Sequence, residues 1–471
     1  MLTETVYEDS RLACWRRVRE FAVPPSMIES ATARRSVGDW AGACAAAGFD
    51  VDFDLRSFAR VRGRELAARI RADLRQLAPD LLRWHLPRIA PDGLLRPGLT
   101  VALARYDSPG PEDGAPVQLV ARTAPAWADG GQRISLALWE GSRSASGPCP
   151  YPRPRPSRRF RLDLHRHLWD ARRTGELWTR SGADRRPPGD GGPGADPALP
   201  AVLPPGLPWA VDRWAAEAEI LLRAEGRTAG PVVVRFGNRQ RMLLDPSAAG
   251  GRSLTDSTAV PGGGSGDGDG SAPPVLPDAA TWTLPDLELL RTGSIEPERL
   301  HPLVASALLP GHPVPAGPAR EDGDGAGRPR PVQCRGALHR IGLVDGVLVA
   351  LDHDPDELRR EELLVALTGT PLPCLQAIDV AHRRPESLAD IRARLDHGDT
   401  AGALAAVEQL LGPDALLRSG ALRDELEAAV QQRITYGLFR AGLAGPAPRS
   451  VPSGRSRSQD HRSRTRRAAG R

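Results

Sequence analysis

The chain has 471 residues, of which 40% are hydrophobic, and its net charge is +5. The sequence contains no lysine, so all 63 basic side chains are arginine. The absence of lysine excludes a Walker A phosphate-binding loop, a protein-kinase active site, and Schiff-base or lysine-nucleophile catalysis, whatever the fold. The length predicts about two to four domains.

Arginine without lysine, together with a single asparagine at Asn238, indicates a GC-rich gene and weakens any argument from arginine content alone. The five cysteines are scattered and none forms a C-x-x-C pair, which predicts reduced thiols rather than a disulfide framework. The first residues are charged and lack the apolar core of a signal peptide. No apolar run approaches the ~18 residues of a membrane span, so we expect a cytoplasmic protein with no membrane association.

Residues 1–180 are predicted to form an N-terminal helix-plus-sheet domain. Ser26 and Glu29 match a capping box at the start of the second of its helices, and the first three helices are expected at 8–22, 26–34 and 40–47. A further helix is expected from residue 64, because apolar residues recur there at helical steps: Leu66, Ile70, Leu74, Leu77 and Leu81. This stripe predicts one buried helix face.

Four short runs with strand-like patterning follow, separated by turn-rich segments: 98–106, 116–123, 132–139 and 158–164. They predict an antiparallel sheet with the N-terminal helices on one of its faces. Residues 170–180 return to a helical pattern.

The middle of the chain alternates between Gly/Pro-rich linkers and short structured segments. Linkers are expected at 181–207, 246–280 and 311–330, a helix followed by two strands at 208–245, and two short helices within 281–310. Residues 189–194 match G-x-G-x-x-G formally. A dinucleotide site needs a strand before and a helix after this motif, and neither is predicted here.

Residues 331–441 are predicted to form a C-terminal domain that starts with a β-hairpin turning at Asp345-Gly346. A helix at 355–367, a strand at 374–380 and three helices are expected after it, the helices at 385–395, 399–411 and 422–438. Residues 442–471 read as a disordered basic tail. The fold class is therefore α+β: N-terminal helices on a small antiparallel sheet, a C-terminal hairpin plus helical domain, long linkers and an Arg/Ser tail.

One short motif occurs twice. Residues 38–43 read GDWAGA and residues 398–403 read GDTAGA. We interpret both as an aspartate that caps an Ala-rich helix. The alternative is a helical-repeat unit, although two distant copies do not make a solenoid.

Basic charge is concentrated in two islands, 151–186 and 449–471, each with a net charge of +7, which leaves −9 for the rest of the chain. Such islands can bind phosphates through counterion release or bind an acidic protein surface. The candidate anion or nucleic-acid contacts are Arg158, Arg159, Arg172, Arg173, Arg455, Arg457, Arg462, Arg464, Arg466 and Arg467. Codon bias alone also accounts for such islands.

No catalytic, cofactor-binding or metal-binding residue is predicted. His165 and His167 share a face only if their strand continues, and a zinc site needs further ligands. Asp352-His353-Asp354 is interpreted as the N-terminal cap of the next helix, since no nucleophile motif accompanies it. We expect no cofactor.

Residues 83–88 (RWHLPR) and 160–177 (FRLDLHRHLWDARRTGEL) resemble segments of uncharacterised proteins of high-GC actinobacteria, a resemblance that implies no activity. Three hypotheses follow. The first is a non-enzymatic cytoplasmic interaction or accessory protein with an unidentified protein partner. The second is a nucleic-acid-associated protein that binds phosphates through 151–186 and 449–471. The third is an enzyme whose site is assembled from dispersed Asp, His and Arg, which a deep pocket with at least three convergent ionisable groups would support.

Overall fold

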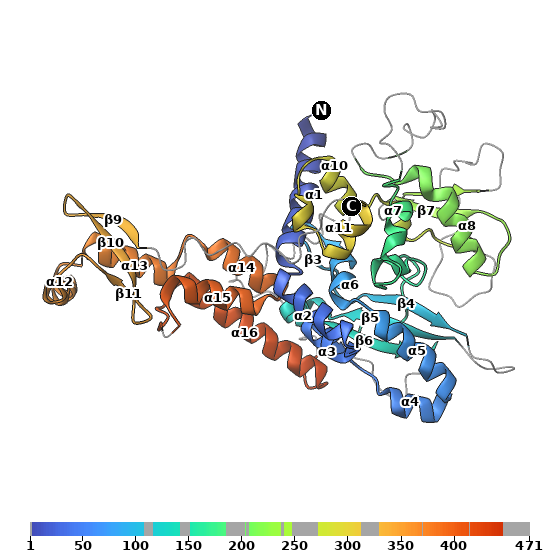
Figure 1. Cartoon of the computed structure of the whole chain (residues 1–471), viewed down its shortest axis with the longest axis horizontal. Coiled ribbons are helices and arrows are strands. Elements are labelled where there is room, and N and C mark those ends of the chain that lie inside the picture. Colours follow the sequence, from blue (N-terminus) through green and yellow to red (C-terminus); the bar gives the residue numbers. More distant parts are fainter. Residues whose placement is uncertain are drawn as a thin grey trace, which may run out of the picture. The chain divides into compact units, whose positions relative to one another are not determined.

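The computed structural model describes most of the chain: residues 2–107, 116–141, 151–184, 203, 207–236, 240–246, 272–311, 329–369, 371–413 and 415–445. The chain divides into two compact units. Unit 1 comprises 1–127, 134–314 and 445–471, and unit 2 comprises 128–133 and 315–444. The mixed α+β class is confirmed, with the elements of each unit labelled in Figure 1. Among the described residues, no helix has the length and apolarity to cross a membrane.

Unit 1 begins with six helices: α1 (Leu2–Phe21), α2 (Pro25–Ser36), α3 (Trp40–Ala46), α4 (Leu55–Arg62), α5 (Arg64–Gln76) and α6 (Pro79–His85). The apolar stripe from Leu66 to Leu81 is buried at all five positions, as predicted. Its helix ends at Gln76, because Pro79 starts a new helix, α6, at a position where its missing N–H costs nothing. The predicted capping box at Ser26 is wrong: Pro24 is the N-cap of α2 and contributes no side-chain hydrogen bond.

Unit 1 also contains a four-stranded sheet that shares a hydrophobic core with these helices. The strand order is β1-β6-β5-β4, with β1 (Phe49–Val51), β4 (Thr100–Tyr106), β5 (Val117–Thr123) and β6 (Ile134–Trp139). Three of these are predicted strands, and they pair antiparallel, whereas β1 pairs parallel to β6. The predicted strand at 158–164 is wrong: only Arg161 forms an isolated bridge, to Ala102, and the chain then enters short 3-10 turns. A small ribbon of β2 (Arg88–Ile89) and β3 (Leu94–Leu95) follows α6.

The rest of unit 1 is a second layer of short elements: α7 (Leu177–Arg180), α8 (Trp214–Ala224), β7 (Val232–Phe236), β8 (Gln240–Leu244), α9 (Asp278–Thr281), α10 (Pro285–Arg291) and α11 (Pro302–Leu308). The predicted helix at 170–180 is limited to 3-10 turns and the single turn of α7. The two strands predicted within 208–245 are present as β7 and β8, which pair antiparallel as a hairpin. Its Gly237-Asn238 turn lies outside the described residues, as do residues 189–194.

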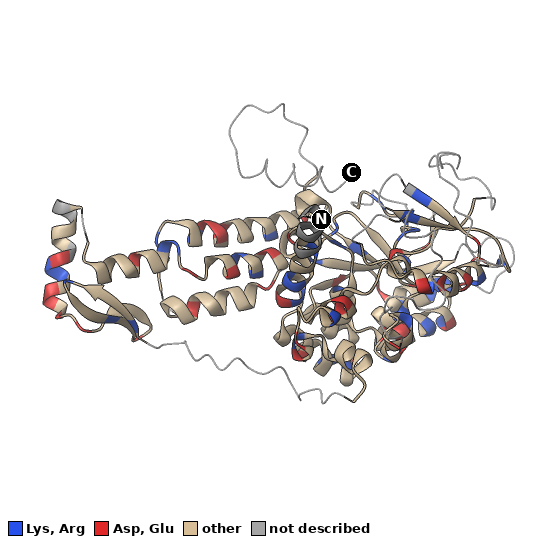
Figure 2. Ribbon diagram, turned by 90° about the horizontal axis from the view of Figure 1, so that it is seen from above, with Lys and Arg blue, Asp and Glu red and all other residues tan. Residues whose placement is uncertain are grey.

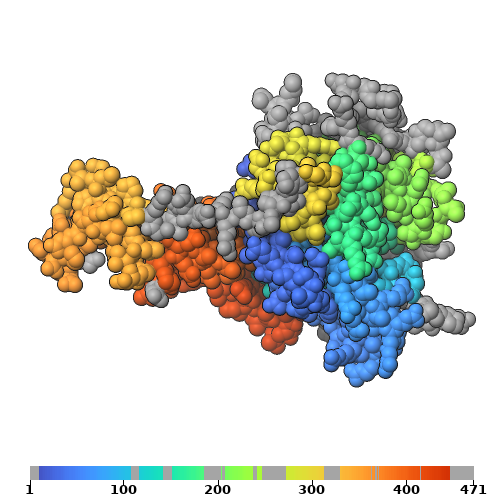
Figure 3. Space-filling model, viewed as in Figure 1, coloured from blue at the N-terminus to red at the C-terminus, as the bar shows by residue number. Residues whose placement is uncertain are grey.

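Segments far apart in the sequence share one core in unit 1. Helix α11 contributes Val304, Ala305 and Leu308, and the turn before it Leu300, to the same hydrophobic cluster as the α5 stripe. Helix α1, blue, and α10, yellow, lie side by side (Figure 1), and in the space-filling view the yellow residues lie directly beside blue residues of the N-terminal helices (Figure 3). The residues between 208 and 245 build a second, smaller cluster around Trp214.

A buried ion pair joins α1, α6 and α10. Arg19 Nη2 lies 2.8 Å from Asp286 Oδ2, and Arg19 Nη1 donates to the carbonyl of Trp84 at 2.8 Å. Trp84 Nε1 donates to the other oxygen of Asp286 at 3.0 Å. Asp286 is 0% exposed and Arg19 5%. Both oxygens of Asp286 and both terminal nitrogens of Arg19 thus have hydrogen-bond partners, whereas the Nε of Arg19 has none.

Unit 2 contains a three-stranded antiparallel sheet and five helices within its described residues: β9 (Arg330–Cys334), β10 (Ala337–Val344), β11 (Val347–Ala350), α12 (Pro355–Thr368), α13 (Pro373–Arg383), α14 (Leu388–His397), α15 (Thr400–Leu411) and α16 (Ala421–Arg440). The hairpin turn is confirmed, with Asp345 at φ 50° and Gly346 at φ 77°. The predicted strand at 374–380 is wrong, because Pro373 opens α13 there.

Residues 128–133 pack against α16 within unit 2. An added Cβ on Gly130 would lie 2.3 Å from the carbonyl oxygen of Gln432, so only glycine fits this backbone approach. Apolar residues recur at steps of four along α16, and this stripe is buried at Leu422 but exposed at Val430, Ile434 and Leu438. The stripe therefore contributes to the core of unit 2 at its N-terminal end alone.

The repeated GD motif adopts the same geometry in both units. Asp39 and Asp399 are N-caps with φ −80°, and each accepts a hydrogen bond from the amide of the glycine three residues on, at 2.8 and 2.9 Å. An arginine five residues before each aspartate pairs with its other oxygen, at 3.0 Å for Arg34 and 2.9 Å for Arg394. The interpretation as capping aspartates is confirmed, and each copy also joins two successive helices.

Removal of Asp286 tests the buried ion pair. Asp286→Ala leaves the Arg19 guanidinium buried without a counter-charge, so we expect a loss of about 3–5 kcal/mol in the free energy of unfolding. All ten tryptophans lie in unit 1, and guanidinium denaturation followed by tryptophan fluorescence therefore reports this unit. The control is Asp92→Ala at an exposed site, with an expected change within about 0.5 kcal/mol. Equal effects of the two variants would contradict the role of the pair.

The two capping aspartates differ in burial, since the Asp399 side chain is 5% exposed and the Asp39 side chain 43%. Asp399→Ala should cost about 1 kcal/mol of local stability, and Asp39→Ala less, because water replaces the lost hydrogen bonds there. Hydrogen exchange of α15 and of α3, measured peptide by peptide, compares the two effects. A larger effect in α3 would show that burial does not set the strength of the cap.

Candidate ligand-binding pocket

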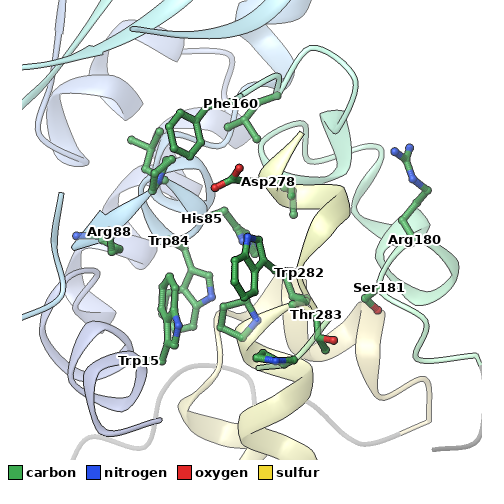
Figure 4. Close-up of a pocket in the computed structure, with 18 of the residues that line it drawn as sticks. Trp15, Trp84, His85, Arg88, Phe160, Arg180, Ser181, Asp278, Trp282 and Thr283 are labelled. Atoms are coloured by element: carbon green, nitrogen blue, oxygen red, sulfur yellow. The ribbon is translucent and has the colours of Figure 1, made fainter. Parts of the chain in front are cut away.

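A cavity of about 970 Å³ opens in unit 1, among side chains from α1, α6, the 159–168 segment, α7, the residues before α8, and α9 with the residues after it. Figure 4 shows Trp15, Trp84 and Arg88 on one side of this pocket and Arg180 and Ser181 on the other, with Asp278 between them. The volume is at the upper end of the range typical of small-molecule sites.

Aromatic side chains form a large part of the wall: Trp15, Trp84, Phe160, Trp209, Phe236 and Trp282. Four of the chain's ten tryptophans therefore line one cavity. Trp209 and Trp282 stack with their ring centroids 4.1 Å apart, and Phe236 meets Trp209 edge-on at 5.0 Å. Flat rings of this kind offer stacking surfaces to a planar ligand.

Positive charge dominates the polar part of the wall. Eight arginines line the pocket, Arg11, Arg19, Arg88, Arg96, Arg159, Arg161, Arg180 and Arg213, against one acidic residue, Asp278. Several of these arginines are neutralised by carboxylates around them. Arg159 pairs with Asp278 at 2.5 Å, Arg161 with Asp163 at 2.7 Å, and Arg180 with Glu217 at 2.6 Å.

Two lining arginines have no carboxylate partner among the described residues, Arg88 and Arg96. Arg88 donates only to backbone carbonyls, of Arg83 at 2.6 Å and Gly93 at 3.3 Å, and its Nε has no hydrogen-bond partner. Burial and the nearby charges of Arg83 and Arg19 lower the pKa of Arg88 well below its ordinary value.

Arg96 lies over the ring of Phe160, with 5.9 Å between guanidinium carbon and ring centroid, and its Nε also lacks a partner. Burial and the charge of Arg159 lower its pKa, which Asp278 only partly offsets. An anion bound beside Arg88 and Arg96 would offset the cost of burying these two guanidinium charges, because it supplies the missing counter-charge.

Uncharged polar side chains also line the pocket, among them two histidines and a serine. Both ring nitrogens of His85 are buried without a hydrogen-bond partner, as is the Ser181 hydroxyl. Burial and the charge of Arg19 lower the pKa of His85 well below its usual range. Burial and neighbouring His165 do the same for His167. These imidazoles are therefore neutral near pH 7 and can donate or accept one hydrogen bond from a ligand.

His165 and His167, the weak metal candidates of the sequence, are buried side by side with ring centroids 5.7 Å apart. His165 Nε2 lies 3.2 Å from Glu217, and its Nδ1 lies 2.9 Å from the carbonyl oxygen of Arg161. Glu217 also accepts from Arg213 at 2.8 Å. His165 and Glu217 are therefore part of a charge network beside the pocket, whose wall includes His167, and the two histidines are not a bare ligand pair.

The predicted anion contacts separate into three groups. Arg159 lines the pocket and is paired, and Arg173 pairs with Glu176 at 2.6 Å on the surface. Arg158 and Arg172 are exposed. The six contacts of the tail lie outside the described residues. Basic and acidic residues are interspersed along the described ribbon of both units (Figure 2). Within the island at 151–186, five arginines pair with carboxylates: Arg159, Arg161, Arg166, Arg173 and Arg180.

The pocket is not recognisable from the sequence because its residues come from seven separated segments: 11–19, 84–96, 159–168, 177–181, 207–213, 236 and 278–285. Within its own segment, each of these residues has an ordinary structural interpretation, such as a tryptophan in a helix, an arginine beside a proline or a histidine in a predicted core helix. The usable signal was the gathering of Phe160 and several arginines in the first basic island. No family model, curated protein or solved structure matches the chain.

The Glu217 network predicts a pH-dependent contribution to stability. Burial opposes ionisation of Glu217, but hydrogen bonds from His165 and Arg180 outweigh it and hold its pKa well below the ordinary value. A depressed carboxyl pKa stabilises the fold above the unfolded value of ~4.3, and this stabilisation is lost as the pH falls below it.

Glu217→Gln should therefore lower the free energy of unfolding by about 3–5 kcal/mol at pH 7, and the difference from the native chain should shrink as the pH falls from 5 toward 3. Guanidinium denaturation followed by tryptophan fluorescence measures both. Glu176→Gln, at a carboxylate 36% exposed, is the matched control with little effect. A difference that stays constant with pH would contradict the assignment.

Proposed function

We propose that unit 1 binds a small molecule that combines a planar aromatic group with an anionic group, the chemistry of a nucleoside phosphate. The observation that carries the proposal is the lining of one 970 Å³ cavity by four tryptophans and eight arginines against a single carboxylate. Planar rings stack on tryptophan. The guanidinium fork binds phosphate or carboxylate oxygens in pairs.

The division of the pocket supports a ligand with two ends. The stacked Trp209 and Trp282 offer an aromatic surface, whereas Arg88 and Arg96 offer positive charge that no described carboxylate neutralises. His85 and Ser181 can then select orientation through single hydrogen bonds. A bound phosphate would take the place of the absent counter-charge.

The three hypotheses from the sequence stay predictions. The convergence of His85, Arg88 and Arg96 meets the condition stated for an enzyme, and the exposed Arg158 and Arg172 leave a nucleic-acid contact open. The exposed apolar residues of α16 favour an interaction protein with a protein partner. Free buried thiols at Cys14, Cys44, Cys334 and Cys374 favour a reducing, cytoplasmic location.

Calorimetric titration of the full chain tests the proposal with three probes: AMP, adenosine and inorganic phosphate. We expect AMP to bind at least about tenfold more tightly than either part alone, a difference of ~1.4 kcal/mol, because only AMP occupies both ends of the pocket. Arg96→Gln should weaken AMP binding by about tenfold and leave adenosine binding unchanged.

The matched control is Arg172→Gln, which removes an exposed arginine of the same unit and should leave all three affinities unchanged. Equal affinities for AMP and adenosine would remove the anionic half of the proposal. Loss of AMP binding in Arg172→Gln would place the anion outside the pocket.

A further inference from the structure

Unit 2 brings together three side chains that zinc binds. The Sγ atoms of Cys334 and Cys374 and a ring nitrogen of His353 all lie within 4.8 Å of one another. Both cysteines are 0% exposed, and the His353 side chain is 3% exposed. Among the described residues this is the group of His, Cys and carboxylate side chains that offers convergent metal-ligand atoms.

Three separate segments supply the group. Cys334 ends β9, at a tight two-residue turn in which Arg335 and Gly336 have φ values of 50° and 83°. His353 lies between β11 and α12, and Cys374 lies in the first turn of α13. The sequence alone predicts scattered cysteines and a capping histidine, because spacings of 19 and 21 positions match no short metal motif.

The orientation of His353 fits a metal ligand. Its Nδ1 faces Glu357 Oε2 at 3.7 Å, and Glu357 accepts a hydrogen bond from Arg335 at 2.9 Å. Its Nε2 is buried and has no hydrogen-bond partner. A carboxylate on one ring nitrogen and a free second nitrogen is the arrangement around many metal-binding histidines. The His339 ring stacks on the His353 ring, with the ring centroids 4.2 Å apart, and covers one of its faces.

We propose that Cys334, Cys374 and the Nε2 of His353 bind a zinc ion. Two thiolates and one imidazole supply three of the four ligands of a tetrahedral zinc site. Soft sulfur ligands select zinc over magnesium or calcium. The two thiols lose their protons on binding, since thiolate is the form that coordinates the metal.

The size of the surrounding core gives the metal a structural role. The cluster that holds this part of unit 2 has six fully buried residues, Cys334, Ile341, Ala350, Leu372, Cys374 and Ile378, and two of them are the proposed ligands. A three-stranded sheet with so small a core is marginal by itself. A zinc ion would tie β9, the loop before α12 and α13 together.

Metal analysis of the full chain tests the site. The chain is expressed with zinc in the medium, purified under reducing conditions and analysed for metal by mass spectrometry. We expect about one zinc per chain, and at least about a fivefold lower content in Cys334→Ser, Cys374→Ser and His353→Gln. Cys14→Ser and Cys44→Ser, at buried free cysteines of unit 1, are matched controls that should retain the metal.

A second measurement does not depend on the folding of a variant. The native chain is stripped with a chelator and titrated with Co²⁺, which shows intense visible absorption when thiolates hold it in a tetrahedral site. We expect that absorption to appear at about one equivalent and to disappear when zinc is added. Reduced chain with no bound metal and no cobalt absorption would overturn the proposal. A Cys334–Cys374 disulfide found by peptide mass in the chain as isolated would overturn it too.

Discussion

The buried ion pair between Arg19 and Asp286 constrains the rest of unit 1. Two charges inside a protein are tolerated only when each meets the other in good geometry, so α1 and α10 have a single acceptable arrangement. Trp84 closes the triangle through its backbone carbonyl and its indole N–H, which fixes α6 as well. Arg19 and Trp84 also line the pocket. The contact that holds the core together therefore also shapes the candidate binding site.

Periodicity predicted the parts of the fold that local sequence controls. The stripe from Leu66 to Leu81 and the turn at Asp345-Gly346 are correct because each depends on neighbours a few residues away. The strand prediction at 374–380 failed because the apolar residues there fit a strand and a helix equally well. Pro373 favours the helix, since proline is well suited to the first helical position. The strand predicted at 158–164 failed for another reason: its arginines bind carboxylates from distant segments.

The two candidate sites show what one sequence cannot supply. Asp286 looks like any acidic residue in a helix's first turn, and nothing local distinguishes it from Asp356. Likewise, Cys334, His353 and Cys374 each have an ordinary local interpretation, and only the fold of the sheet against α13 makes them a group. The sequence also cannot distinguish a ligand-binding arginine of the pocket from an arginine that codon bias alone explains. Pairing distinguishes them: most are neutralised, and Arg88 and Arg96 are not.

The exclusive use of arginine in the pocket wall has a regulatory consequence. Many anion sites built on lysine can be switched off when an amine is acetylated, since acylation removes the positive charge. The guanidinium groups here offer no primary amine to such enzymes. The electrostatic attraction of this cavity is thus fixed once the chain has folded, and its occupancy would follow the supply of the small molecule alone.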